Sequence, residues 1–209
     1  LSERLIYPSD SHGKLGGKSA GMFLARKILE RSVSELEGME GVRVPRTWHI
    51  ASDAIISFIQ YNSLEDVYDR KYLEVEEIRR QYPNVIQDFK FAPFPPELVN
   101  GLSRVLEDMG DCPLIVRSSS LLEDRSGSAF SGKYKSLFLA NQGTKEERLR
   151  ALQDAVSEVY ASVFGPDPIE YRAERNLLDV HEEMGIMIEE VVGTRVGRFF
   201  LHAFAGVAF

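Results

Sequence analysis

The 209-residue sequence is poor in the residues that build disulfides and metal sites. It has one cysteine, Cys112, so an internal disulfide is excluded, and a lone cysteine fits a reducing compartment. Its four histidines lie far apart, at His12, His49, His181 and His202. None of them has a metal-ligand partner at a useful spacing, so a metal site built from histidine and cysteine is not expected.

Long apolar runs and an excess of positive charge are also missing. Every apolar run is shorter than a membrane span, and the first residues lack the apolar segment of a secretory signal, so we expect a cytoplasmic protein. Lysine and arginine number 25 against 32 for aspartate and glutamate, which gives a net charge of −7. This balance argues against a broad nucleic-acid or membrane interface, and it leaves room for a local basic pocket that binds a small anion.

Both ends of the sequence are unusual. The chain begins with Leu1, and residues 199–209 are apolar or glycine except for His202. Native termini are usually polar and loosely held. We therefore interpret the chain as part of a longer protein and residues 199–209 as a buried strand, with a true C-terminal core strand as the alternative.

Periodicity and turn residues predict both helices and strands. The expected helices cover residues 18–31, 52–61, 64–82, 97–109, 145–164 and 168–178. The expected strands cover residues 42–50, 113–117, 134–140, 184–192 and 196–209. Ser52 and Asp53 are expected to cap the second helix, and Tyr82-Pro83-Asn84 to break the chain after the third.

The segment Val116–Gly132 is the most informative stretch for function. A short apolar run leads into Arg117, and the loop that follows is crowded with serine and glycine. Small residues allow the backbone to approach a ligand and to offer its N–H groups. A fixed cation beside such a loop is suited to polyphosphate, and the alternative is a polar surface loop with an ordinary exposed arginine.

A glycine cluster near the start, residues 12–19, differs by one residue from a phosphate-binding P-loop. That motif needs glycine where His12 stands, and it should follow a full buried strand, so we reject it. What remains is a glycine turn that places Lys18 at the start of a helix, where backbone N–H groups and the helix dipole favour an anion. An ordinary helix start with a solvated lysine is the alternative.

Several motifs occur together in a familiar order. They are Gly16-Gly17-Lys18, Val42-Arg-Val-Pro45, Val116-Arg-Ser-Ser119 with Glu123-Asp124, Ser128-Ala-Phe-Ser-Gly132, the helix at 155–164, and Ile169-Glu-Tyr171-Arg172. The chain resembles the N-terminal ATP-binding domain shared by phosphoenolpyruvate synthase, pyruvate phosphate dikinase and rifampin phosphotransferase. The resemblance covers residues 13–209 and is weak over 62–95.

The resemblance implies an α+β fold, the N-terminal portion of an ATP-grasp-like nucleotide-binding domain with mixed sheets and flanking helices. We expect one subdomain at residues 1–110, with a charged helical insertion at about 62–95, and a second at 111–209. Enzymes of this family transfer a phosphoryl group from ATP to a histidine on a separate swivelling domain, and then to pyruvate or a similar acceptor. The histidine and acceptor-binding domains would be the partners, and self-association is expected for the exposed apolar end.

The resemblance also implies roles for particular residues. Lys18 and Arg117 would contact the phosphates of ATP, with Arg117 positioning the phosphoryl group. Gly132 and Ser136 would belong to a glycine-rich lid, and Glu189 and Val191 to the hinge that meets adenine. The ligands of Mg²⁺ would lie after residue 209, so we expect the 209 residues alone to be inactive.

Two departures from the family pattern weaken a direct transfer of function. The lid reads Gly132-Lys-Tyr-Lys-Ser136 where many members have Gly-Gln-Gln-Glu-Thr, and its two lysines suggest stronger phosphate binding or a different acceptor. Glu189 stands where many members have glutamine.

Glu182-Glu183 are interpreted as a solvated acidic pair. The alternative function is a non-catalytic nucleotide-sensing or interaction module derived from this domain.

Overall fold

The computed structural model describes residues 4–12, 14–32, 41–120, 133–180 and 183–206. The helices are α1 (Gly17–Ser32), α2 (Ala54–Tyr61), α3 (Val75–Phe91), α4 (Pro96–Met109), α5 (Lys145–Ala161) and α6 (Pro166–Glu174), with two 3₁₀ helices, η2 (Glu65–Tyr72) and η3 (Ser162–Phe164). The strands are β1 (Leu5–Ile6), β2 (Thr47–Ile50), β3 (Leu114–Ser120), β4 (Ser136–Leu139), β5 (Met184–Glu190), β6 (Thr194–Val196) and β7 (Phe199–Leu201).

Strands from both halves of the sequence alternate in one mixed sheet. Its order is β1-β2-β5-β3-β4, with β1 parallel to β2 and all other neighbours antiparallel. β5 therefore lies between β2, which precedes residue 110, and β3, which follows it. The division expected at residue 110 does not separate two sheets, and only the hairpin β6–β7 forms a second sheet among the described strands.

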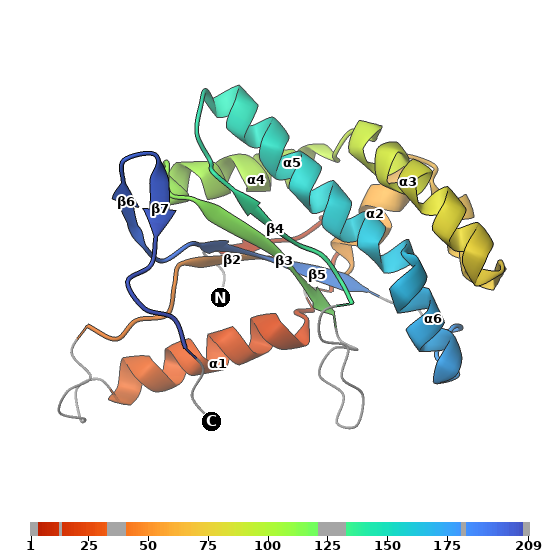
Figure 1. The fold of residues 1–209 in the computed structure, drawn as a ribbon, viewed down its shortest axis with the longest axis horizontal. Helices are drawn as coiled ribbons and strands as arrows, with labels where there is room; N and C mark the ends of the chain where they lie inside the picture. The colour runs from red at the N-terminus through yellow and green to blue at the C-terminus, as the bar shows by residue number, and fades with distance from the viewer. Residues whose placement is uncertain (1–3, 13, 33–40, 121–132, 181–182, 207–209) are drawn as a thin grey trace.

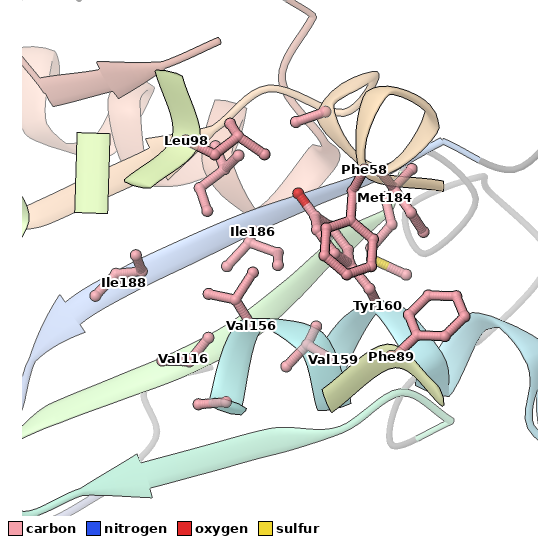
Figure 2. Close-up of a cluster of buried hydrophobic side chains, with 14 of the residues drawn as sticks. Phe58, Phe89, Leu98, Val116, Val156, Val159, Tyr160, Met184, Ile186 and Ile188 are labelled. Carbon is pink, nitrogen blue, oxygen red and sulfur yellow. The ribbon is translucent and has the colours of Figure 1, made fainter. Parts of the chain in front are cut away.

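The two faces of the main sheet are covered unequally, as Figure 1 shows. Among the described helices, α1 alone lies along one face, and the others pack on the opposite side. The core is on that opposite side, where Val116, Ile186 and Ile188 meet Val156 and Val159 of α5 (Figure 2). Because side chains alternate along a strand, the odd-numbered residues of β3 and β5 face α1.

Helix α3 continues through the Tyr82-Pro83-Asn84 segment, so the expected break is wrong. A proline inside a helix costs about 3 kcal/mol because it removes a hydrogen bond and crowds the preceding turn. The apolar face of α3 offsets this cost. Phe89 is buried, and its ring lies 5.6 Å from that of Phe58 and 5.7 Å from that of Phe164.

The described part of the apolar segment, residues 199–206, is largely exposed, against the expectation of a buried strand. Within it, Phe199–Leu201 form a strand, β7, and its partner is β6 instead of the main sheet. Phe204, beyond β7, is 95% exposed. The expected helices α1, α4 and α5 are confirmed. The helix expected at 64–82 is instead divided into η2 and α3, and the strand expected at 42–50 is reduced to Thr47–Ile50.

Candidate functional site

Two small residues, Gly16 and Ser119, dock the start of α1 against β3. A Cβ atom added to Gly16 would lie 1.6 Å from the carbonyl oxygen of Ser119, so only glycine fits there. The Ser119 hydroxyl accepts a hydrogen bond of 3.0 Å from the backbone N–H of Ser19. Since Ser19 lies in the first turn of α1, this contact fixes where the helix begins.

Lys18 is the second residue of α1 and lies beside the strand that carries Arg117. Its Nζ donates a 3.4 Å hydrogen bond to the carbonyl oxygen of Ser118. Arg117 and Ser119 point to the same face because they are two residues apart on β3. The structure therefore brings Lys18 and Arg117 to the α1 face of the sheet, although they are far apart in the sequence.

A row of residues crosses the sheet on this face. Ser136 of β4 pairs with Arg117, Arg117 with Met187 of β5, and Met187 with His49 of β2. Ser136, one of the two expected lid residues, is exposed beside Arg117. The other, Gly132, lies outside the described residues.

Arg117 and Glu189, expected at the phosphate and base ends of a nucleotide, form an ion pair. Arg117 Nη1 donates to Glu189 Oε2 at 3.3 Å. The arginine side chain is 40% exposed, and the glutamate side chain is 7% exposed. The pairing of β3 with β5 creates this contact between residues 72 positions apart.

An apolar pocket of about 330 Å³ lies beside Val191, the other expected hinge residue. Its lining includes Phe138, Leu139, Phe199, Phe200, Arg195 and Arg198. Phe138 is on the α1 face because it pairs with Ile115 of β3. Small-molecule pockets are typically apolar cavities of about 300 Å³ or more with a few polar groups, and this pocket fits that description.

The segment that leads into the glycine turn is held by two carboxylates. Asp53 accepts hydrogen bonds from the Ser11 hydroxyl at 2.6 Å and from the backbone N–H of His12 at 2.8 Å. Glu183 accepts a 2.7 Å hydrogen bond from the Ser52 hydroxyl and lies 3.9 Å from Lys14. Asp53 occupies the N-cap position of α2 as expected, but its side chain makes no capping hydrogen bond. Glu183 is bound to Ser52 and is not the solvated acid expected, and Glu182 lies outside the described residues.

We expect Asp53→Asn to lower the free energy of unfolding by about 1–2 kcal/mol. The amide keeps the size of the side chain, but it loses the charge and turns one acceptor into a donor that faces another donor. Urea unfolding of the variant and of Asp10→Asn, an exposed position on the same segment, measures the difference. Equal unfolding midpoints for wild type and Asp53→Asn would contradict this role.

His49 lies in the same row as Arg117, and sequence reasoning did not single it out. It is 8% exposed, and its Nδ1 atom is buried with no hydrogen-bond partner in the structure. Burial lowers the pKa of His49 to about 4, from 6.5 for a free histidine. The imidazole of His49, which lies on the α1 face of β2, is therefore neutral at neutral pH.

His49 should make the fold acid-sensitive. Between pH 6.5 and about 4 the unfolded chain binds a proton that the folded protein excludes, so stability is complete above pH 6.5 and falls with the pH. We expect the wild type to lose about 2 kcal/mol more than His49→Leu between pH 7.5 and pH 5. Urea unfolding at both pH values tests this, with exposed His202→Leu as control. An identical pH dependence in wild type and His49→Leu would refute it.

The two lysines of the expected lid have partners on the α5 side of the sheet. Lys135 Nζ lies 2.7 Å from Glu158 of α5, which also pairs with Lys90 at 2.9 Å. Lys133 Nζ lies 5.9 Å from the ring centre of Tyr171. Lys135 is therefore neutralised by α5, and the structure gives no support to the idea that these lysines strengthen phosphate binding.

No three His, Cys, Asp or Glu side chains in the described part of the chain gather into a metal site. None of the described helices is long and apolar enough to cross a membrane.

A helix start that carries a lysine lies at the Ser119 end of β3, and the apolar pocket lies at its Pro113 end; both features are found in nucleotide-binding domains. Residues 12–209 match the family described as "Pyruvate phosphate dikinase, AMP/ATP-binding domain". The chain belongs to this family, which confirms the resemblance drawn from its motifs.

The chain is also similar to a phosphoenolpyruvate synthase from Aquifex aeolicus (strain VF5). The two are 28% identical over 185 residues, which cover 83% of this chain and 20% of that protein. The chain thus spans about a fifth of the length of this relative.

Proposed function

We propose that this chain binds ATP on the α1 face of the main sheet, as the ATP-binding part of a phosphotransferase with an ATP-grasp-like domain. The phosphoryl group would pass from ATP to a histidine on a separate swivelling domain and then to pyruvate or a similar acceptor. The family membership and the similarity to a phosphoenolpyruvate synthase support this proposal.

The observation that carries the proposal is the docking of α1 on β3. It sets Lys18 and Arg117 together on one face, at a helix start where an anion is favoured. A lysine gives a flexible point charge and an arginine a planar set of donors, so the two suit a polyphosphate that changes shape during transfer.

A site for the base lies at the end of the sheet, next to this face. The pocket beside Val191 begins at Phe138, which is level with Ile115 on β3. From Ile115 to Ser119 the strand rises about 13 Å, at about 3.3 Å per residue. An extended nucleoside triphosphate spans such a distance, so we propose that adenine enters the pocket and the phosphates reach Lys18 and Arg117.

The contribution of these residues would be positioning and charge compensation, which dominate phosphoryl transfer. Family members would use Mg²⁺ with ATP, but the described carboxylates do not fit a metal site. Asp53 and Glu183 hold the segment before the glycine turn, and Glu189 pairs with Arg117. We therefore assign no residue of the described chain to a metal.

Calorimetric titration of the full chain with ATP tests the proposal. Lys18→Met should weaken ATP binding about tenfold or more, because it removes a charged hydrogen-bond donor. Lys27→Met is the matched control, since Lys27 lies on the same helix but pairs with Glu30. Unchanged ATP binding by Lys18→Met would overturn the proposed site.

An assay of AMP and phosphate release by the full-length protein tests the catalytic part. Release that requires ATP supports a phosphotransferase. ATP binding without any release would instead support the nucleotide-sensing alternative.

A further inference from the structure

Strand β5 ends in two adjacent buried carboxylates that face opposite sides of the sheet. Glu189 is 5% exposed and faces α1, whereas Glu190 is 7% exposed and faces the helical side. Glu190 is well satisfied, because it accepts hydrogen bonds from the backbone N–H of Arg46 at 3.0 Å and from its Nε at 2.7 Å. Arg43 lies 3.8 Å away and adds a second positive charge.

Glu189 has far fewer partners. Arg117 Nη1, at 3.3 Å, is its one hydrogen-bond donor among the described residues. Its cross-strand neighbours are Ile115, which is apolar, and Thr47, whose hydroxyl donates to the carbonyl oxygen of Pro45 at 3.0 Å. A buried carboxylate needs a compensating charge, so Arg117 is held to Glu189.

The contact with Glu189 occupies only a small part of the hydrogen-bonding capacity of Arg117. A guanidinium carries five N–H donors, and the described structure gives Arg117 one long hydrogen bond to one oxygen. Its side chain is 40% exposed on the α1 face of the sheet. Arg117 therefore keeps donors for a second anion, while Glu189 cancels its net charge.

We propose that Glu189 is the resident counter-ion of Arg117 and sets the affinity of the site by competing with nucleotide phosphate for this arginine. The inference rests on the proposed function, in which Arg117 binds phosphate. When a triphosphate arrives, the Glu189 carboxylate repels it at short range in a poorly hydrated site. Glutamine at this position keeps the size and the acceptor oxygen but removes the repulsion.

The proposal predicts an effect that grows with phosphate charge. Glu189→Gln should bind ATP about tenfold more tightly than wild type, which corresponds to about 1.4 kcal/mol. The gain should be smaller for AMP and absent for adenosine. A glutamate that contacts only the purine edge would instead change the affinity for all three ligands by the same factor.

The experiment is a calorimetric titration of the full chain with ATP, AMP and adenosine. Glu190→Gln is the matched control, because it removes an equally buried charge from the other face and should leave ATP affinity unchanged. Glu189→Met, also neutral and of similar size, serves if Glu189→Gln does not fold as judged by thermal unfolding. ATP binding that is unchanged or weaker in a folded neutral variant would overturn the proposal, as would an equal gain for adenosine.

Arg117→Met separates this inference from the proposed function. If Arg117→Met binds ATP as the wild type does, the phosphate site itself is wrong. If Arg117→Met loses ATP binding while Glu189→Gln leaves it unchanged, the site stands and the counter-ion role of Glu189 fails.

Discussion

Gly16→Ala is expected to lower the free energy of unfolding by about 3 kcal/mol and to abolish ATP binding. The new methyl group would lie 1.6 Å from the carbonyl oxygen of Ser119. That oxygen belongs to the backbone of β3, where Ser119 pairs with Gly185 of the central strand β5, so it cannot move aside cheaply. The start of α1, and Lys18 with it, would be pushed off the strand.

Gly21→Ala is the matched control for this prediction. Gly21 lies on the same helix, and a Cβ atom added there meets nothing within 4 Å. Alanine in a helix interior is favoured over glycine by about 0.5–1 kcal/mol, so this variant should be slightly more stable than wild type. Urea unfolding compares the two variants. A Gly16→Ala protein as stable as Gly21→Ala would show that the docking contact is not tight.

Arg117→Met is expected to weaken ATP binding by about ten- to a hundredfold. Hydrogen bonds to charged groups contribute about 1.5–3 kcal/mol, and each 1.4 kcal/mol is a factor of ten. The variant should also be less stable, because Glu189 is left buried without its cation. Calorimetric titration and urea unfolding measure the two effects.

Two further proteins separate the effects of Arg117→Met. Arg79→Met removes an exposed arginine that pairs with Glu76 on α3, and it should change neither quantity much. The double variant Arg117→Met with Glu189→Gln should recover stability but not ATP binding. Full recovery of ATP binding in the double variant would mean that Arg117 serves only to neutralise Glu189.

The ion pair and the hydrogen bonds that hold this site together join residues far apart in the sequence, so no local pattern specifies them. Glu189 reaches Arg117 because β5 inserts between β2 and β3, and Asp53 reaches Ser11 because β1 lies beside β2. A sequence pattern indicates that a segment is extended, but it does not say which strand lies next to it. The ion pair of Glu189 with Arg117 and the hydrogen bonds of Asp53 with Ser11 and His12 were therefore not predicted.

Pro83 illustrates the same limit in a helix. Proline disfavours a helix interior, so the sequence predicts a break at this position. The burial of Phe89 at the far end of α3, against Phe58 and Phe164, outweighs that preference. Only the packed structure contains these aromatic contacts, so the continuous helix was not predictable from the residues around the proline.

Features that rest on short-range backbone geometry could be predicted from the sequence. The glycines before Lys18 indicated the start of α1, and Gly110, with a φ of 64°, closes α4 as expected. Motifs around Lys18 and Arg117 also indicated the family, because their residue types and order match its pattern. Which charges meet depends on the pairing of strands that are distant in the sequence, because this pairing places Glu189 beside Arg117 and buries His49 in the same row.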